Sequence, residues 1–169
     1  MNAQEQKPFE EILGYLEGKK KIVLMGCGGC ATIFHTGGVK EVNEMAERLE
    51  REGKEIIGKI ALPFGVFACY LPMSSMFLKE HREEIEQCDA MLMQCCGDGA
   101  QAVRGYLEEE MKIVKPIYPS VNALGFSSGG PVVFKEECQA CGACEPVSYT
   151  HLRAHETEAE LVCRLLLEK

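Results

Sequence analysis

Cysteine is the residue type in this sequence with the most chemistry to offer. The chain of 169 residues contains 10 cysteines, and most of them stand at short spacing: Cys27-Gly28-Gly29-Cys30, Cys95-Cys96 and Cys138-x-x-Cys141-x-x-Cys144. Two thiolates separated by two residues can bind one iron or zinc from a single loop, because the chain turns between them and both sulfur atoms face inward. This spacing predicts a metal-binding protein.

Length and composition indicate that these cysteines are free thiols rather than disulfide staples. A chain with 46% hydrophobic residues suits one compact domain whose core needs no disulfides. The polar segment 1–8 does not resemble a secretory signal, and the apolar runs are too short to span a bilayer. The net charge of -8 argues against nucleic acid as a partner. We expect a cytoplasmic protein without a membrane span, in which thiols stay reduced.

Apolar residues follow helical spacing in some segments and form the short runs of buried strands in others. Helices are predicted at 9–16, 39–49, 76–85 and 100–107, and strands at 21–25, 55–62, 90–94 and 112–118. Strands that alternate with helices form right-handed βαβ crossovers. We therefore expect an α/β fold, with an open, mainly parallel four-stranded sheet that carries helices on both faces and is followed by a Cys-rich loop segment.

The carboxyl ends of three predicted strands carry four cysteines. Cys27 and Cys30 follow the first strand, Cys69 lies in the loop after the second, and Cys96 closes the third. Ligands of parallel sheets gather beyond the carboxyl ends of the strands, so we expect these thiols to meet at one edge. Four thiolates suit either a 4Fe-4S cluster or a tetrahedral zinc, and the residue types do not choose between the two metals.

The same cysteines also have a structural interpretation as small buried hydrophobic residues. This interpretation is strongest for Cys88, which precedes a strand without a neighbouring glycine, and weakest for the Gly-rich Cys27 loop. Cys69 lies between the two cases. In the doublet, Cys96 is the better candidate ligand because glycines follow it, whereas Cys95 continues the strand; the sequence alone leaves this choice open.

Two other functions would use the first cysteine loop. Gly26-x-Gly28-x-x-Ala31 after a strand is a permissible dinucleotide-binding fingerprint. Against it, the second strand lacks the acidic residue that would bind a ribose hydroxyl, and Gly37-Gly38 interrupts the following helix. Cys27-x-x-Cys30 alone could support dithiol exchange, which would leave the other cysteines without a role.

The three cysteines Cys138, Cys141 and Cys144 match the first three ligands of a ferredoxin-type cluster motif. The fourth ligand of that motif would stand at position 148, which is Ser148 in this chain. Cys163 is the remaining cysteine downstream that could substitute for it. We expect these three residues to bind a second cofactor in an incomplete centre.

Composition divides the chain into an α/β metal-binding domain at 1–134, the Cys-rich motif at 135–146 and a tail at 147–169. The tail bears no relation to the Gly-rich segment before it and looks like a translated adapter sequence, so we expect it to be non-native. A genuine C-terminal helix is the alternative, because Thr157 and Glu160 fit a capping box. His151 and His155 have the i,i+4 spacing of metal ligands, but no further ligand is near them.

Four segments together resemble one family, the methylenetetrahydrofolate reductase C-terminal domain family. They are VLMGCGGCATIFHTGGVKEV, ALPFGVFAC, QCCGDGAQAV and VFKEECQACGACEP, and the likeness covers roughly positions 9 to 146. Family members are small iron-sulfur and zinc subunits that accompany a flavin-containing reductase. The resemblance implies that one metal centre is ligated by Cys27, Cys30, Cys69 and Cys96, and that a second begins with Cys138, Cys141 and Cys144.

The resemblance also implies a function in one-carbon metabolism. The flavin and folate would bind to the partner, the flavin-containing methylenetetrahydrofolate reductase catalytic subunit, and this chain would transfer electrons to or from that flavin without catalysing the reaction itself. Family members continue past the three-cysteine motif with a further Cys-containing segment, which the tail 147–169 replaces here. The alternative is a structural zinc-binding module that docks on a partner without electron transfer.

Overall fold

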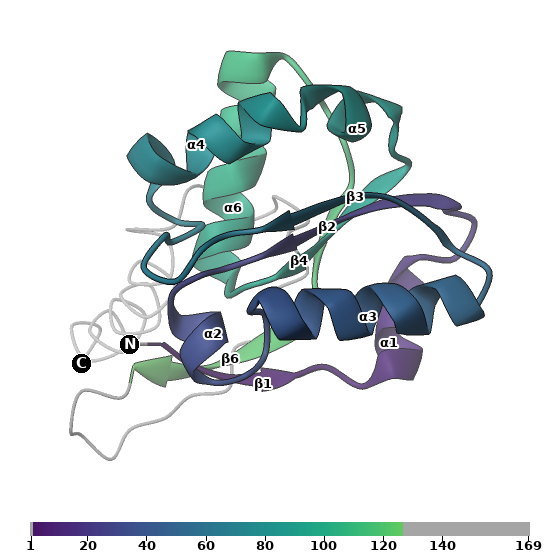
Figure 1. Cartoon of the computed structure of the whole chain (residues 1–169), viewed down its shortest axis with the longest axis horizontal. Helices are drawn as coiled ribbons and strands as arrows, with labels where there is room; N and C mark the ends of the chain where they lie inside the picture. The colour runs from purple at the N-terminus through teal and green to yellow at the C-terminus, as the bar shows by residue number, and fades with distance from the viewer. Residues whose placement is uncertain (1, 127–169) are drawn as a thin grey trace, which may run out of the picture.

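The computed structural model describes residues 2–126, so the predicted motif at 135–146 and the predicted tail at 147–169 lie outside the described residues. The elements in chain order are β1 (Asn2–Gln6), α1 (Phe9–Tyr15), β2 (Lys21–Gly26), α2 (Cys30–Ile33), α3 (Val39–Arg51), β3 (Glu55–Ala61), α4 (Leu71–Glu80), α5 (Arg82–Gln87), β4 (Ala90–Gln94), α6 (Gly97–Tyr106), the π-helical turn η1 (Leu107–Met111), β5 (Ile117–Pro119) and β6 (Val121–Phe126) (Figure 1).

Four strands form one parallel sheet in the order β3-β2-β4-β5, which confirms the predicted sheet. β2 lies in the middle, with Met25 paired to Ile60 of β3 on one side and to Met93 of β4 on the other. The chain leaves β2 for β3 and later returns to the opposite side of β2 as β4. The carboxyl ends of β2 and β4 are therefore a topological switch point, the place where sheets of this kind bind ligands.

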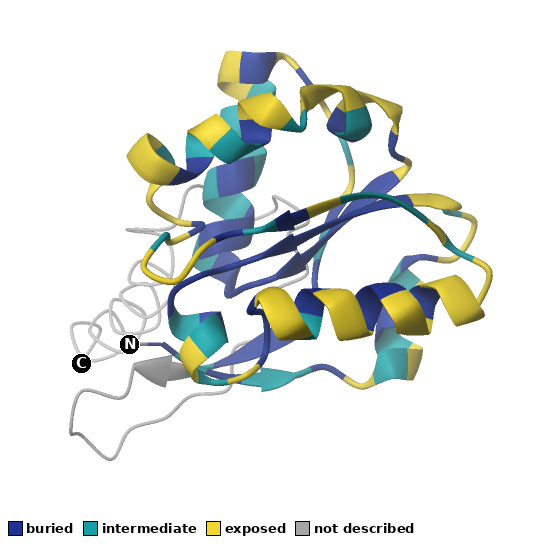
Figure 2. Cartoon of the chain, in the orientation of Figure 1, coloured by how far each residue is buried: buried dark blue, intermediate teal, exposed yellow. Residues whose placement is uncertain are grey.

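Helices cover both faces of the sheet, as predicted. Leu24 and Leu92 belong to the buried cluster that includes Val42 and Leu49 of α3, whereas Met25 and Met93 belong to the cluster under α4, α5 and α6. Neighbouring residues of a strand face opposite sides, so each strand supplies both clusters. Figure 2 shows the buried strands between two helical layers with exposed outer sides. None of the helices within residues 2–126 is long and apolar enough to cross a membrane.

Some elements differ from the sequence-based expectations. A two-stranded antiparallel sheet of β1 and β6 was not predicted, because the sequence of β1, NAQEQ, has no apolar alternation. The helix predicted at 76–85 is two helices, α4 and α5, and the strand predicted at 112–118 begins only at Ile117. These differences do not affect the edge of the sheet where the cysteines were expected.

Candidate metal centre

Two of the four predicted ligands leave the sheet at the topological switch point. Cys27 directly follows β2, and Cys96 is the N-cap residue of α6, just beyond β4. Because β2 and β4 are adjacent parallel strands, both residues start from the same end of the sheet. Both are buried, with 6% of Cys27 and 8% of Cys96 exposed. This pair forms the interior side of the candidate centre.

The other two predicted ligands are closer to the surface. Cys30 begins α2 and is partly exposed, and Cys69 is an exposed residue of the loop between β3 and α4. This loop and the first cysteine loop follow neighbouring parallel strands. The candidate centre therefore has a buried side and an accessible side.

Charged groups of the first cysteine loop act on the Cys69 thiol. Partial burial of its sulfur raises the pKa of this thiol, and the charges of Cys27, Asp98 and Cys30 raise it further. A neighbouring negative charge disfavours the thiolate only when it is near. The loop of Cys69 therefore lies near the loop that carries Cys27 and Cys30.

Cys96 belongs to the same group of thiols. Burial raises the pKa of Cys96 to about 12, and the charges of Asp98, Cys69 and Cys27 contribute in the same direction. A hydrogen bond from the backbone of Gly99 opposes this shift because it stabilises the thiolate. At neutral pH the Cys96 side chain is a neutral thiol that must lose its proton before it can bind a metal.

Three atoms of Cys27 form hydrogen bonds that hold the residue in place. Its backbone N–H donates to Gly37 at 2.9 Å, its carbonyl oxygen accepts from the Thr32 hydroxyl at 2.8 Å, and its Sγ accepts from the backbone N–H of Ala68 at 3.4 Å. Ala68 immediately precedes Cys69. The hydrogen bond to sulfur therefore joins the two loops that carry Cys27 and Cys69.

Gly28 allows these two loops to touch. A Cβ atom at Gly28 would clash with the carbonyl oxygen of Pro63, and two backbone hydrogen bonds cross the contact. The Gly28 N–H donates to Val66 at 3.0 Å, and the Gly65 N–H donates to Gly28 at 2.8 Å. Only glycine fits this close approach, so the residue between the first two cysteines determines where the loop of Cys69 can lie.

Cys95 and Cys96 have different surroundings. Cys95 is 1% exposed and belongs to the buried apolar cluster under α4, α5 and α6. A Cβ at Gly99 would lie 2.9 Å from the Cys95 sulfur, so the first turn of α6 packs against this side chain. The structure therefore places Cys95 in the core cluster and Cys96 outside it, at the start of α6.

Cys88 is a core residue, as its structural interpretation predicted. It is 2% exposed, and its Sγ donates a hydrogen bond to the carbonyl oxygen of Ile85 at 3.1 Å. Burial raises the pKa of this thiol to about 11. Cys88 lies before β4, at the opposite end of that strand from Cys96.

The donor chemistry of the four predicted ligands fits a thiolate-bound metal. Thiolates are the ligands of iron-sulfur clusters and of many zinc sites. The N–H groups of Ala68 and Gly99 form hydrogen bonds to the sulfurs of Cys27 and Cys96, as outer-sphere donors do around metal thiolates. As the side chains stand, no group of three or more His, Cys, Asp or Glu within residues 2–126 is arranged to hold a metal ion.

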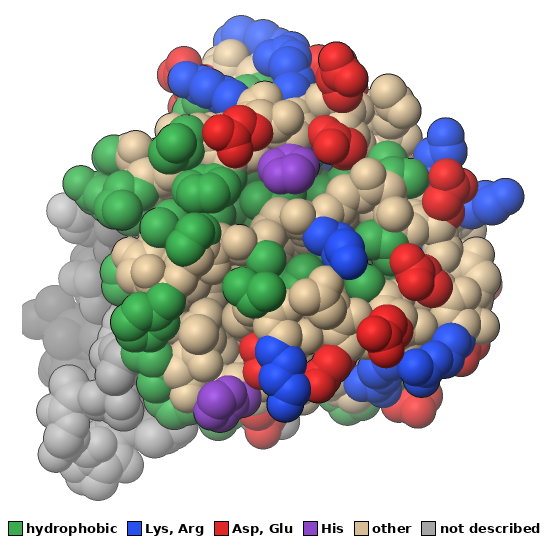
Figure 3. Space-filling model, in the orientation of Figure 1, with side chains coloured by type: hydrophobic (Ala, Val, Ile, Leu, Met, Phe, Trp, Pro, Cys, Tyr) green, Lys and Arg blue, Asp and Glu red, His purple; other side chains and the backbone are tan. Residues whose placement is uncertain are grey.

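Exposed apolar side chains surround the accessible side of this centre. Phe64 is 77% exposed and Tyr70 is 52% exposed, and both lie in the loop that carries Cys69. Met73 and Met76 of α4 are also exposed. Figure 3 shows hydrophobic side chains gathered on the side of the molecule where this loop and α4 lie. Such a patch beside a functional site is typical of a protein interaction surface.

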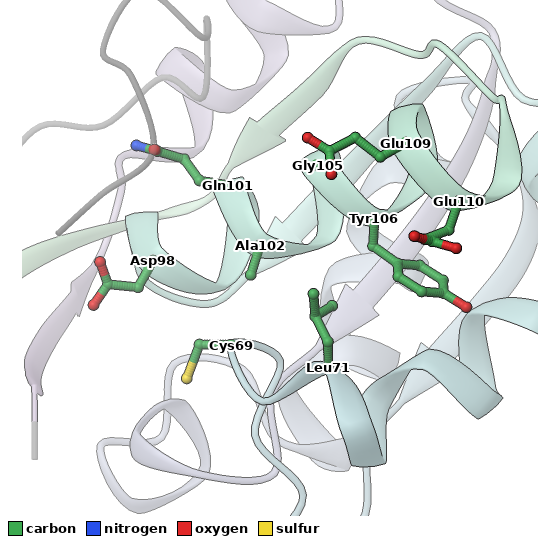
Figure 4. Close-up of a pocket in the computed structure, with 9 residues that line it drawn as sticks. All are labelled: Cys69, Leu71, Asp98, Gln101, Ala102, Gly105, Tyr106, Glu109 and Glu110. Atoms are coloured by element: carbon green, nitrogen blue, oxygen red, sulfur yellow. The ribbon is translucent and has the colours of Figure 1, made fainter.

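A cavity of about 710 Å³ lies next to Cys69 (Figure 4). It runs between Leu71 at the start of α4 and the face of α6 that carries Asp98, and it continues to η1. This cavity was not predicted from the sequence. Its sequence signal is weak, because small residues at helical spacing, such as Ala102 and Gly105, also occur where helices pack closely.

The comparisons with known proteins add no family assignment. No protein-family model and no curated protein match the chain. A solved structure with partial similarity is an ABC transporter substrate-binding protein from Sphaerobacter thermophilus, with 19% sequence identity and a TM-score of 0.44. The match covers 68% of this chain and 28% of that protein, so the chain spans less than a third of its length. Similarity at this level carries no functional meaning.

Proposed function

We propose that this chain is a non-catalytic electron-transfer subunit of an oxidoreductase complex, with an iron-sulfur cluster bound by Cys27, Cys30, Cys69 and Cys96. The observation that carries the proposal is the hydrogen bond from the Ala68 N–H to the Cys27 Sγ, which joins the loops of Cys27 and Cys69 at the end of the sheet where Cys96 also starts. Three loops that are distant in sequence carry these four cysteines at the same end of the sheet. A shared position of this kind is expected of metal ligands and is not needed for small core residues.

The residues around the thiols have defined tasks in this proposal. When bound, a 4Fe-4S cluster supplies one-electron transfer. Cys27 and Cys96 hold its interior side away from water, and the N–H groups of Ala68 and Gly99 stabilise negative charge on their sulfurs. Hydrogen bonds to sulfur raise the reduction potential of such centres, because they favour the more negative reduced state.

The exposed side of the centre supports docking on a redox partner. Cys69 is accessible, and the apolar side chains of Phe64, Phe67 and Tyr70 in its loop would be covered by a partner surface. The partner proposed from the sequence resemblance is the flavin-containing methylenetetrahydrofolate reductase catalytic subunit. Contact at this surface would bring the flavin and the cluster close enough for electron exchange.

Anaerobic reconstitution of the full chain with iron and sulfide tests this function. We expect protein-bound iron and sulfide, with a broad thiolate-to-iron absorption band that bleaches on reduction. Cys96→Ala should remove the iron of this centre, whereas the buried control Cys88→Ala should keep it. The iron lost in Cys138→Ala gives the share that Cys138, Cys141 and Cys144 bind together, apart from the first centre.

The metal content of these samples separates the proposed function from its alternative. Stoichiometric zinc without iron or sulfide, lost in Cys96→Ala, would reject electron transfer and identify a structural zinc module. Full iron loading of Cys96→Ala would reject the assignment of these four cysteines. For the zinc module, the partner subunit would be reduced by an electron donor that does not pass through this chain. Its activity with and without this chain measures whether docking alone is sufficient.

A further inference from the structure

The cavity beside Cys69 is a groove along one face of α6. Asp98, Ala102 and Gly105 line it at the i, i+4 and i+7 positions of the helix, and Leu71 of α4 lies opposite. Its volume of about 710 Å³ falls within the range of small-molecule sites, on the order of 300 to 1,000 Å³. Among its described lining residues, Cys69 is the one that is also a predicted metal ligand.

The floor of the groove is apolar and empty. Among the described residues, a Cβ atom added at Gly105 would meet no atom within 4 Å, so no side chain of residues 2–126 fills this space. Ala102 and Leu71 provide aliphatic surface next to it. An alkyl chain could lie along this floor and displace water from it.

Carboxylates stand at both ends of the groove. Figure 4 shows Asp98 at one end and Glu109 and Glu110 at the other, with Tyr106 beside the glutamates. The two consecutive glutamates both line the groove because they belong to the π-helical turn η1, which widens the helix. Asp98 and Glu109 are separated by roughly 16 Å along the helix axis, at about 1.5 Å per residue.

Positive charge is missing from the described lining of the groove. None of the described residues lining it is Lys or Arg. Arg104 of the same helix forms an ion pair with Glu108 at 2.8 Å instead. Within residues 2–126, no ion pair involves Asp98, Glu109 or Glu110. The groove therefore combines an empty apolar floor with separated negative charges.

We propose that this groove binds a linear polyamine, with one ammonium group at Asp98 and another at Glu109 and Glu110. The alkyl segments between the ammonium groups lie over Ala102 and Gly105, and the Tyr106 ring adds a cation–π contact at the glutamate end. A single small cation would leave one end of the groove unmatched. A dicarboxylate of similar length would be repelled at both ends.

Isothermal titration of the full chain with spermidine at low salt tests this proposal. Butylamine is the matched monoamine and suberate is the matched dianion. We expect spermidine to bind at least about tenfold more tightly than butylamine, because it meets carboxylates at both ends, and we expect no binding of suberate. Equal affinity for spermidine and butylamine, or no spermidine binding, would overturn the proposal.

Two sets of variants assign the binding to the groove. Glu109→Gln with Glu110→Gln should weaken spermidine binding roughly tenfold, and Glu47→Gln with Glu50→Gln on α3, which makes the same change in net charge, should not.

Gly105→Leu should fill the floor of the groove and abolish spermidine binding, while Gly105→Ala verifies that the helix tolerates substitution. Equal losses in both Gln pairs would show general charge attraction and reject the groove, as would unchanged binding in a folded Gly105→Leu variant. Iron loading of Gly105→Leu tests the proposed metal centre independently.

Discussion

The backbone N–H of Ala68 donates a hydrogen bond to the Sγ of Cys27 at 3.4 Å. This contact ties the loop after β3 to the loop after β2, and it leaves the next residue, Cys69, at the open side of the same group of thiols. The same contact therefore connects the positions of two candidate ligands.

Gly28→Ala should damage both stability and metal binding. The new Cβ would clash with the carbonyl oxygen of Pro63, so the backbone contact between the two cysteine loops must open. We expect a loss of about 2 kcal/mol in the free energy of unfolding, as in other overpacked sites, together with reduced iron loading. Urea denaturation and iron analysis measure the two effects.

Gly14→Ala is the matched control for this variant. Gly14 lies in α1, and a Cβ there would meet nothing within 4 Å. The control should be neutral or more stable by up to about 1 kcal/mol, because alanine favours helix. Similar behaviour of the two variants would show that the contact between Gly28 and Pro63 does not organise the site.

The two cysteines of the doublet should respond in opposite ways to substitution. Cys95→Ala removes a buried core side chain and should lower the free energy of unfolding by about 1 to 2 kcal/mol while leaving the iron content unchanged. Cys96→Ala should lose the iron of this centre with a smaller effect on the stability of the metal-free protein. Loss of iron only in Cys95→Ala would exchange the assignments of these residues.

The two central strands of the parallel sheet, β2 and β4, could be predicted because they are buried on both faces. The strand expected at 90–94 is β4, Ala90–Gln94, and every one of its residues is buried. Such strands appear in the sequence as continuous apolar runs, which need no knowledge of their partners. The carboxyl-end rule for parallel sheets then located Cys27 and Cys96 without any contact information.

The elements that were not predicted from the sequence depend on partners far along the chain. β1 is a polar segment that becomes a strand only because it pairs with β6. The groove at α6 likewise exists because Ala102 and Gly105 are small and because Leu71 lies across from them. Neither relationship leaves a local pattern in the sequence, so local periodicity could not reveal them.

Metal binding should release protons from the cysteine group. Burial raises the pKa of Cys96 to about 12 and also raises that of Cys69, so both side chains are neutral thiols at pH 7 and must be deprotonated by the metal. We expect zinc addition to the metal-free protein in weak buffer to release protons, and the apparent zinc affinity to increase with pH. A pH indicator measures the release, which should be smaller in Cys96→Ala. Equal proton release in this variant would contradict the proposed role of Cys96.

We expect the free energy of unfolding to decrease in alkaline solution because of the buried Cys88 thiol. Burial raises the pKa of this thiol from 9.0 to about 11, so between these pH values the unfolded chain loses the proton while the folded chain keeps it. The neutral thiol contributes its full stability below pH 9, and this contribution falls as pH rises toward 11, by at most about 3 kcal/mol.

Cys88→Ser isolates this contribution from the other groups that titrate in the same range. Serine does not ionise there, and its hydroxyl can still donate a hydrogen bond to the carbonyl oxygen of Ile85, as the Cys88 thiol does. We expect the wild-type free energy of unfolding, measured by urea denaturation, to fall relative to that of the variant as the pH is raised from 9 to 11. Parallel curves across this range would show that Cys88 ionises as readily in the folded protein as in the unfolded chain, and its burial in the core would then have no electrostatic consequence.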